Sequence, residues 1–259
     1  MRTVVISGAS SGIGRATAAR FARSGDRVVN LDVTAPQDPG PGESAVSWLK
    51  VDTADWTAVR EALGQVHQET GRLDVVIANA GISVRHGVLD IEEADARRIT
   101  DVNLLGVLGL WQAAARIMVG QEAGAEPGTP RGVLLATASV NGRRGYPFYA
   151  DYNATKAGII ALTQTFALEL SPAVRVACVS PGAVLTPMQL AEYTGEMLAA
   201  TNAQIPAGRH ADPDEIAAAF HYLASADARF VTGQELVIDG GETAGATTSA
   251  YGTAVVADH

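Results

Sequence analysis

The stretch Gly8-Ala9-Ser10-Ser11-Gly12-Ile13-Gly14 joins a short apolar run to a helical pattern near the start of the chain. Its glycines suit a tight turn that a dinucleotide can approach. Gly8 permits the turn, Gly12 lets the backbone come close to a pyrophosphate, and Gly14 lets the helix pack closely on the strand. The N-terminus of the helix then favours the phosphate charge. The stretch predicts a dinucleotide site; the alternative, if the turn stood alone, is a plain strand-to-helix connection.

The rest of the chain alternates between short apolar runs and longer helical patterns. The expected strands are Val4–Ser7, Val28–Leu31, Val46–Val51, Val75–Ala78, Val133–Thr137, Val174–Val179 and Leu236–Ile238. The expected helices are Ile13–Ser24, Trp56–Thr70, Arg97–Val119, Tyr152–Leu170 and Pro213–Ala224. Uniformly apolar runs are typical of parallel strands covered on both faces. We therefore expect an α/β fold, a single-domain Rossmann-type doubly wound parallel sheet of about seven strands with helices on both faces.

Three segments depart from this alternation. Residues 33–45 contain three prolines and two glycines, so we expect no crossover helix there. The segment 120–131 is rich in Gly, Pro and Glu and is expected to be a long, mobile loop. We place the catalytic domain at residues 1–241. The tail, residues 242–259, is expected to be disordered or to pack on a neighbouring subunit.

The bulk composition excludes several classes of partner. The 259 residues, 47% hydrophobic and 18% charged, describe a compact globular protein. A formal net charge of −9 disfavours nucleic acids and anionic membranes. The single cysteine, Cys178, cannot form an internal disulfide. Since we also find no signal peptide and no apolar run long enough to span a bilayer, we expect a cytoplasmic protein with a small-molecule substrate.

Asp32 ends the second expected strand, at about the distance from the glycine turn where a ribose-binding acid is expected. A carboxylate there can accept hydrogen bonds from both adenosine ribose hydroxyls and would repel a 2′-phosphate. This favours NAD over NADP, with an ordinary turn-forming Asp as the alternative. Arg15 is a counter-signal, but it lies inside the helix, and the nearer Ser11 and Val33 carry no charge.

A tyrosine and a lysine, Tyr152 and Lys156, share one face of an expected helix and follow Ser139 in the chain. A phenol with a pKa of about 10 is a poor base near neutrality. We expect the nearby ammonium, together with an oxidised nicotinamide, to lower that pKa. Ser139, at the end of a strand, can orient a substrate oxygen. Tyr149 is a rival phenol, but it lacks a lysine four residues later.

The glycine turn, Ser139 and the Tyr152/Lys156 pair follow one another along the chain as they do in the classical short-chain dehydrogenases/reductases, and the chain resembles that family over residues 3–241. The matching pieces are Ser7–Gly14, Asn79-Ala80-Gly81, Asn103, Ser139, Tyr152-Asn153-Ala154-Thr155-Lys156, Pro181-Gly182 and Thr186. Two positions depart from the commonest pattern: Ser7 stands where threonine is usual, and Ala78 where a first asparagine is usual.

The resemblance implies roles for four catalytic residues. Tyr152 would be the general acid/base, and Lys156 would tune it and bind the nicotinamide ribose. Ser139 would position the substrate, and Asn103 would hold a water in the proton relay. The implied cofactor-binding residues are Gly8, Ser10, Ser11, Gly12, Ile13, Gly14, Asp32, Val33, Asp52, Thr53, Asn79, Ala80, Gly81, Tyr152, Lys156, Pro181, Gly182, Val184 and Thr186. No metal is implied.

Family resemblance also places the substrate pocket, between segments 139–152 and 82–87 and the segment after Thr186. The candidate substrate residues are Ser139, Asn141, Arg143, Arg144, Tyr146, Phe148, Tyr149 and Met188. The two arginines could bind a substrate carboxylate, or they could be solvated or at a subunit interface. Leu185–Gln204 reads as an amphipathic lid that closes over the site.

These features predict an NAD-dependent oxidoreductase that interconverts a secondary alcohol and a ketone. The missing crossover helix and the acidic Asp32 resemble bacterial members that oxidise ring-borne alcohols or dihydrodiols. The alternatives are a 3-oxoacyl thioester reductase of the same family, a non-catalytic dinucleotide-binding regulator, and an epimerase or dehydratase that uses bound NAD transiently. The helices Arg97–Val119 and Tyr152–Leu170 resemble the family's dimer helices, so we expect a homotetramer.

Overall fold

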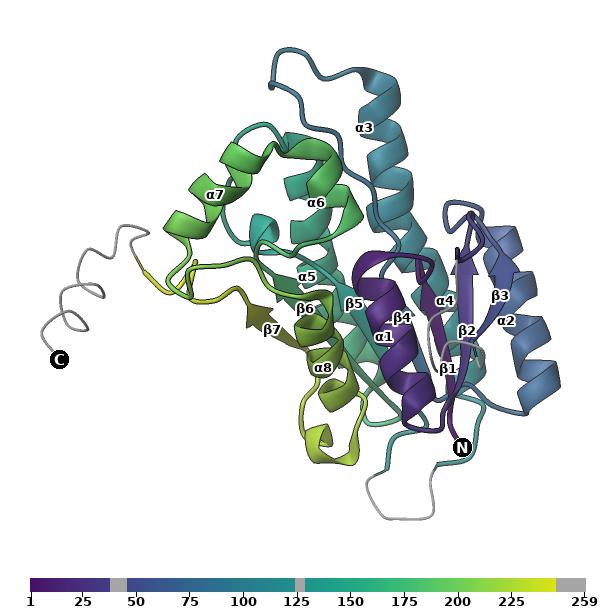
Figure 1. Ribbon diagram of the computed structural model, residues 1–259. Coiled ribbons are helices and arrows are strands. Elements are labelled where there is room, and N and C mark those ends of the chain that lie inside the picture. Colours follow the sequence, from purple (N-terminus) through teal and green to yellow (C-terminus); the bar gives the residue numbers. More distant parts are fainter. Residues whose placement is uncertain (38–45, 124–128, 246–259) are drawn as a thin grey trace, which may run out of the picture.

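The computed structural model describes residues 1–37, 46–123 and 129–245. In these residues, seven parallel strands form one sheet in the order β3-β2-β1-β4-β5-β6-β7 (Figure 1). The strands are β1 (Thr3–Ser7), β2 (Arg27–Asp32), β3 (Val46–Lys50), β4 (Val75–Ala78), β5 (Gly132–Thr137), β6 (Val174–Pro181) and β7 (Gln234–Ile238). The longer helices are α1 (Gly12–Arg23), α2 (Trp56–Thr70), α3 (Glu93–Thr100), α4 (Gly106–Met118), α5 (Ala150–Leu170), α6 (Pro187–Glu192), α7 (Gly195–Gln204) and α8 (Pro213–Leu223).

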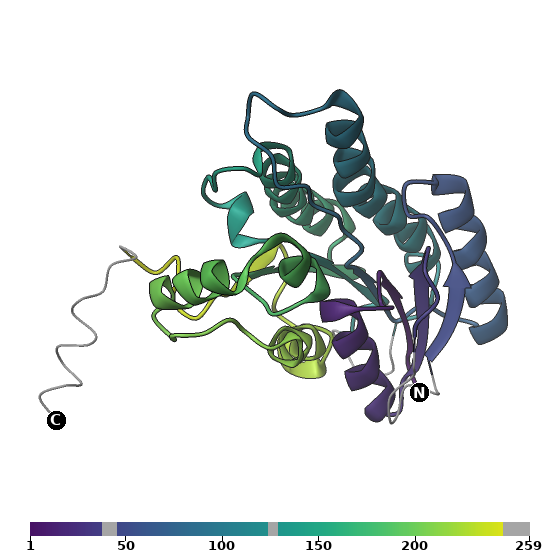
Figure 2. The ribbon, with the colours of Figure 1, turned by 45° about the horizontal axis from the view of Figure 1, so that its top comes forward.

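Helices cover both faces of the sheet and divide the core into two layers. On one face α1 packs against α8, with Phe21 and Phe220 fully buried. On the other face α2, α4 and α5 cover the sheet, around the buried Leu63 and Trp111 (Figures 1 and 2). The central strands are buried along their whole length because both of their faces are covered. The predicted single-domain, doubly wound α/β fold is confirmed.

The strand order places a crevice at the carboxyl end of β1. This strand has β2 on one side and β4 on the other, and the chain crosses the sheet in opposite directions to reach them. Ligands of open α/β sheets bind at such a switch point. The predicted lid segment forms α6 and α7, which lie over this end of the sheet (Figure 2).

One expected helix differs from the prediction. Instead of a single helix Arg97–Val119, the chain forms α3, a five-residue π-helical turn at Asp101–Leu105, and α4. The amide of Gly106 donates to the carbonyl of Asp101, five residues back. The extra residue in this turn brings Asn103 to a fully buried position. The helix was expected from its apolar run as a whole, and such a run does not mark where a π-turn inserts one residue.

The three irregular segments are described in part. Residues 38–45, 124–128 and 246–259 lie outside the described residues, so the expectations for them stay predictions. The start of the expected tail is folded: Glu242 is buried, and its carboxylate is paired with Arg144. Among the described helices, none is both long and apolar enough to cross a membrane.

Candidate active site

The glycine turn after β1 packs so closely on neighbouring backbone that a side chain would not fit at Gly8 or Gly14. Gly8 has a φ of +68°, and a Cβ there would lie 2.7 Å from the Cα of Ala80. A Cβ on Gly14 would lie 2.1 Å from the carbonyl oxygen of Gly8. The two glycines therefore let the turn pack closely on the end of β4 and let α1 pack closely on the turn, and Gly8 and Gly12 line the crevice at the start of α1. This arrangement fits the pyrophosphate of a dinucleotide, which the helix N-terminus attracts.

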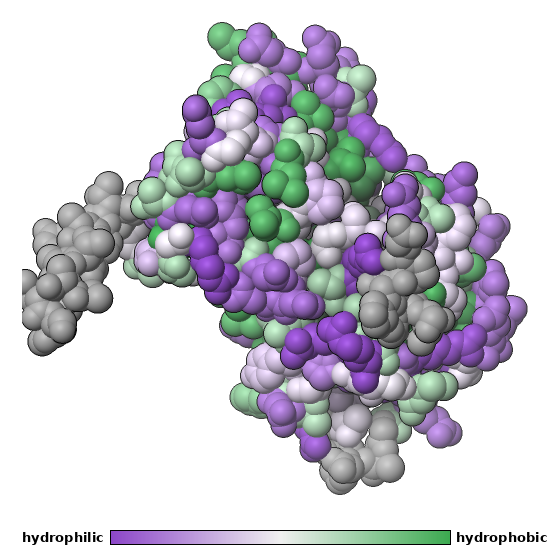
Figure 3. Space-filling model, viewed as in Figure 1, coloured by the Kyte–Doolittle hydropathy of each residue, from purple (hydrophilic) through white to green (hydrophobic). Residues whose placement is uncertain are grey.

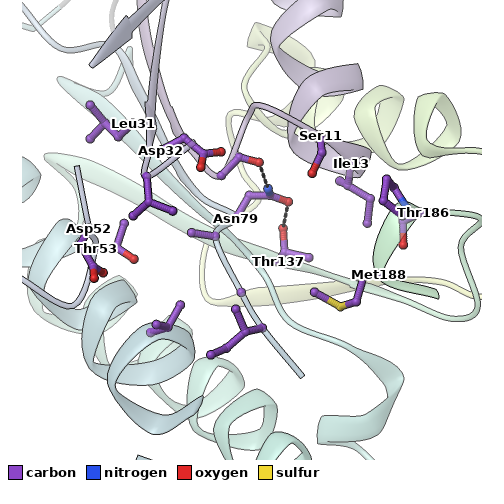
Figure 4. A pocket seen from close by; sticks show the side chains of 18 of the residues that line it. Ser11, Ile13, Leu31, Asp32, Asp52, Thr53, Asn79, Thr137, Thr186 and Met188 are labelled. Carbon is purple, nitrogen blue, oxygen red and sulfur yellow. Dashed lines mark hydrogen bonds between the residues drawn. The ribbon is translucent and has the colours of Figure 1, made fainter. Parts of the chain in front are cut away.

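Hydrogen bonds fix the ends of β1, β4 and β5 to one another. The Ser7 hydroxyl accepts from the amides of Asn79 and Ala80, at 3.0 and 3.1 Å. The Asn79 side chain donates to the carbonyl of Gly8 at 3.0 Å and accepts from the Thr137 hydroxyl at 2.9 Å (Figure 4). Ser7 thus supplies the hydroxyl that the commoner threonine would supply, and the floor of the crevice is rigid.

A cavity of about 300 Å³ runs along this crevice (Figure 4). The predicted cofactor residues that line it are Gly8, Ser11, Gly12, Ile13, Asp32, Val33, Asp52, Thr53, Asn79, Ala80, Gly81, Tyr152, Lys156 and Thr186. Five predicted residues do not line it: Ser10, Gly14, Pro181, Gly182 and Val184. Residues that sequence reasoning missed are Leu31, Val51, Ile82, Arg98, Val102, Thr137 and Pro187.

The adenosine end of the cavity carries two carboxylates. The oxygens of Asp32 accept from the amides of Ser10 and Thr34, at 3.1 and 3.0 Å, which holds the carboxylate at the end of β2. Asp52 accepts from Arg98 at 2.9 Å. Sequence reasoning found no basic residue on this side, but Arg98 lines the cavity. Its charge is paired with Asp52, so this end of the cavity keeps an acidic group at Asp32.

The catalytic candidates converge at the other end of the cavity. Ser139 follows β5, and Tyr152 and Lys156 come from successive turns of α5. The Lys156 ammonium lies 5.3 Å from the centre of the Tyr152 ring and donates to the Thr137 carbonyl at 2.8 Å. The Ser139 hydroxyl is hydrogen-bonded to the Tyr152 phenol. The geometry brings together the three groups that the sequence singled out.

Burial dominates the protonation of both titratable groups. It raises the pKa of Tyr152 to about 12, opposed by the hydrogen bond to Ser139 and assisted by the charge of Glu192. Burial also lowers the pKa of Lys156 to about 8. The expected lowering of the tyrosine pKa by the ammonium is therefore not seen in this structure. The physical reason is that desolvation of both groups outweighs their mutual attraction.

Asn103 lies on the π-turn and fixes the segment after β4. Its side chain accepts from the amide of Ile82 at 2.9 Å and donates to the carbonyl of Ile82 at 2.8 Å. It also donates to the Thr155 hydroxyl at 3.4 Å. The side chain thus connects the wall of the cofactor cavity to α5. Its implied part in a proton relay stays a prediction.

A second cavity, of about 320 Å³, shares Tyr152 and Met188 with the first. Five predicted substrate residues line it: Ser139, Asn141, Tyr146, Tyr149 and Met188. Sequence reasoning did not single out the polar residues Ser83, Gln189, Glu192, Tyr193, Thr201, Gln204 and Glu242. Glu192 lies inside the segment Leu185–Gln204, which the sequence predicted as a lid, although Glu192 itself was not predicted as a substrate residue. Exposed hydrophobic residues gather in and beside α6, at Leu185, Met188 and Leu190 (Figure 3).

The arginines and Phe148 do not line this cavity. Arg143, predicted as a substrate residue, lies 3.7 Å from Glu235 of β7, and half of its side chain is exposed. Arg144 pairs with Glu242 at 3.0 Å. Each arginine is engaged with an acid from the far C-terminal part of the chain, which local sequence could not reveal. Phe148 is exposed and stacks on Arg85.

No cluster of three or more His, Cys, Asp or Glu side chains in the described residues is placed to hold a metal ion. Cys178 is buried in β6 and lines neither cavity. The titratable groups at the junction of the two cavities are therefore a phenol and an ammonium. Such a pair can hold and move a proton at a substrate oxygen.

Comparisons with known proteins agree with this geometry. A family model described as enoyl-(acyl carrier protein) reductase matches residues 8–243. The chain is 35% identical over 251 residues to a 3-oxoacyl-(acyl-carrier-protein) reductase of Thermotoga maritima, covering 93% of this chain and 97% of that one. It is also 35% identical over 251 residues to cis-4-hydroxycyclohexanecarboxylate dehydrogenase of Sinomonas cyclohexanicum, covering 94% and 97%.

A solved structure agrees as well. The fold matches 3-ketoacyl-(acyl-carrier-protein) reductase from Brucella melitensis complexed with NADH, with a TM-score of 0.85 and 31% identity over 93% of this chain and 98% of that one. Motifs, fold and relatives coincide over nearly the whole described chain. The protein belongs to the short-chain dehydrogenase/reductase family.

Proposed function

We propose that the protein is an NAD-dependent oxidoreductase that interconverts a secondary alcohol and a ketone, with Tyr152 as the general acid/base. The observation that carries the proposal is the position of Tyr152, which lines both the dinucleotide crevice and the second cavity. A substrate in the second cavity would meet the phenol at the point where the two cavities join. A cofactor in the crevice would meet the same point.

Bound NAD would supply the hydride acceptor for alcohol oxidation and bound NADH the hydride donor for ketone reduction. The remaining chemistry belongs to the side chains of this chain. Ser139 and Tyr152 hold the substrate oxygen between a hydroxyl and a phenol. In alcohol oxidation Tyr152 accepts the hydroxyl proton, and in ketone reduction it returns a proton to the forming alkoxide. The Lys156 side chain is held by the Thr137 carbonyl, and its ammonium form would stabilise the phenolate once the pKa of Tyr152 is lowered by a bound oxidised nicotinamide. Ile82, fixed by Asn103, closes the wall behind these groups.

The preference for NAD rests on Asp32. Its carboxylate lines the crevice at the end of β2, where it can accept from ribose hydroxyls and repel a 2′-phosphate. Arg98 does not offset this repulsion, because its charge is paired with Asp52. We expect Asp32→Ala to narrow the preference for NAD over NADP by about 10-fold or more, measured as the ratio of kcat/KM values for the two cofactors. Equal use of the two cofactors by the unmodified protein would contradict the assignment.

A small cyclic alcohol is the substrate class we favour, because the second cavity is compact and is lined by tyrosines from α5, from the segment before it and from the lid. The relative named as a cis-4-hydroxycyclohexanecarboxylate dehydrogenase supports the ring-borne alcohol in this class, although the ring in that name also carries a carboxylate. The second candidate is reduction of a 3-oxoacyl thioester, which the Thermotoga maritima relative favours at the same identity. NADH formation from cyclic and linear secondary alcohols, compared with NADH and NADPH consumption by 3-oxoacyl thioesters, separates the two. Turnover confined to thioesters with NADPH would contradict both the substrate class and the role of Asp32.

A regulator that binds the dinucleotide without chemistry is disfavoured by the intact group of Ser139, Tyr152 and Lys156. An epimerase or dehydratase would not release free NADH during alcohol oxidation, so the same assay tests that alternative. We also propose a homotetramer, since the outer face of α5 exposes the small Ala157 and Ala161. A cytoplasmic location stays a prediction from the sequence.

A further inference from the structure

The second cavity contains a carboxylate that no cation in the described part of the chain neutralises. Glu192, on α6, points its two oxygens at neutral hydroxyls: one accepts from Ser83 at 2.5 Å and the other from Tyr149 at 2.6 Å. Ser83 follows β4 and Tyr149 precedes α5, so the carboxylate spans the cavity between the lid and the catalytic helix. Hydrogen bonds to hydroxyls hold the carboxylate in place but leave its charge intact.

The groups that face Glu192 are neutral or acidic. The other titratable residues that line the cavity are Tyr146 and Tyr149 before α5, Tyr152 on α5, Tyr193 beside Glu192 in the chain, and Glu242 from the C-terminal segment. The charge of Glu242 is compensated by Arg144. Among the described residues that line the cavity there is no lysine and no arginine. A ligand in this cavity therefore meets one uncompensated carboxylate and a set of hydroxyls.

This arrangement selects among substrates by their polar groups. A second carboxylate placed beside Glu192 would meet repulsion and no cation from the described lining to balance it. A hydroxyl group can donate to a free lone pair of Glu192, and hydrogen bonds to a charged acceptor are about twice as strong as neutral ones. The acceptor lies close to the reacting phenol, since the Tyr149 and Tyr152 rings are in edge-to-face contact with centroids 6.1 Å apart.

We propose that Glu192 is a specificity-determining residue that accepts a hydrogen bond from a second hydroxyl of the substrate, so that the enzyme acts on uncharged diols or polyols. The inference rests on the proposed function and narrows its substrate class. It also accounts for the arginines: Arg143 and Arg144 are engaged by Glu235 and Glu242, so neither of them is available to a substrate carboxylate.

The charge of Glu192 has a second consequence, because it helps to raise the pKa of Tyr152. Alcohol oxidation requires the phenolate, so its rate rises as pH increases through that pKa. Replacing the carboxylate by an amide removes the repulsion between the two negative groups. We therefore expect Glu192→Gln to move the rising limb of the pH–rate profile to lower pH. A purely structural role for Glu192 would not move it.

The experiment compares kcat/KM with NAD for three ring substrates: a vicinal cyclohexanediol, cyclohexanol and a hydroxycyclohexane carboxylate. We expect the unmodified enzyme to prefer the diol to cyclohexanol by about 10- to 100-fold. We expect Glu192→Gln to lose most of that preference: its amide oxygen can still accept from one of the two hydroxyls, but its amide nitrogen can only donate to the other. Glu196→Gln is the matched control, because Glu196 is an exposed carboxylate on the neighbouring lid helix α7 and does not line the cavity.

The outcomes separate this inference from the proposed function. Similar kcat/KM values for diol and cyclohexanol in the unmodified enzyme would overturn the role of Glu192 and leave the secondary-alcohol assignment intact. So would an unchanged diol preference in Glu192→Gln, or a preference for the hydroxy acid. Turnover of 3-oxoacyl thioesters with none of the three ring substrates would overturn the proposed function and this inference with it. Thermal unfolding of both variants checks that they are folded.

Discussion

For single residues, burial decides the protonation of the proposed catalytic pair, Tyr152 and Lys156. Lys156 is 3% exposed, and its pKa falls from 10.5 to about 8 because the ammonium is desolvated. Between pH 8 and 10.5 the unfolded chain therefore binds more protons at this position than the folded chain does. By linkage, the contribution of Lys156 to the free energy of unfolding increases as pH rises through this window and is constant below it.

Lys156 should therefore make the protein more stable as the pH rises through this window. The free energy of unfolding of the unmodified protein, relative to Lys156→Met, is expected to increase by about 3 kcal/mol between pH 8 and 10.5. Urea unfolding of both proteins at a series of pH values measures the difference and cancels the titration of other groups. A difference that stays flat across the window, or that shrinks, would show that Lys156 is not desolvated in the folded state.

The sequence was enough to predict which residues are candidates for the site, but it could not predict what surrounds them in the fold. The spacing of Tyr152 and Lys156 and the position of Ser139 are enough to predict a proton-transfer group from the sequence alone, and the structure places the three residues close together. The direction of the pKa of Tyr152 depends on burial and on Glu192, which lies forty residues away in the chain. Likewise, the acids that engage Arg143 and Arg144 come from the C-terminal part of the chain.

At the element scale, close packing of a short helical turn on α5 sets the distance between Ser139 and Tyr152. Gly142 ends the turn that follows Ser139, and a Cβ on it would lie 2.7 Å from the Lys156 carbonyl carbon and 2.8 Å from the amide of Ala157. These neighbours are backbone atoms of a long helix, so they cannot give way cheaply. An added methyl group must move the turn, and Ser139 with it.

The second prediction is therefore that Gly142→Ala lowers kcat at least 10-fold and destabilises the fold by about 1–3 kcal/mol. The matched control is Gly145→Ala, where an added Cβ would meet no atom within 4 Å and the backbone φ is not positive. We expect this control to keep both activity and stability. Steady-state rates and thermal unfolding measure the effects; equal behaviour of the two variants would rule out this packing constraint.

The strands could be predicted from uniformly apolar runs, because both faces of the sheet are covered, and most helices could be predicted from the longer helical patterns between them. The exception is the expected helix Arg97–Val119, where the π-turn at Asp101–Leu105 interrupts the helix around Asn103. A π-turn inserts one residue without changing which residues are apolar. The sequence pattern therefore predicted helical structure there and could not predict how Asn103 is presented.

In the whole molecule, α5 has one face toward the core and the candidate active site and another face toward solvent. Its inner face carries Lys156 and the core residue Ile159, and its outer face exposes Ala157, Ala161 and Leu168, the last 84% exposed. An outer face of small and apolar residues suits a closely packed two-fold helix interface. The helix that positions the catalytic groups would then also be fixed by a neighbouring subunit.

The third prediction tests that surface. We expect the unmodified protein to run as a tetramer in light scattering coupled to size exclusion, and Ala161→Arg to give a smaller species with lower activity. Gln68→Arg, an exposed change of the same kind on α2, is expected to leave the tetramer intact. A monomeric unmodified protein, or a tetramer unaffected by Ala161→Arg, would contradict the proposed interface.

Turnover by Tyr152→Phe, measured beside NADH binding by the same variant, decides whether this phenol is the general acid/base. The change removes one hydroxyl where the two cavities meet, so we predict a fall in kcat of roughly 10²- to 10⁴-fold, with the Kd for NADH, measured by fluorescence, changed by no more than about 3-fold. Tyr222→Phe, at an exposed position on α8, is the control and should keep full activity. Unchanged turnover in Tyr152→Phe would contradict the assignment of this phenol as the acid/base, and with it the proposed mechanism.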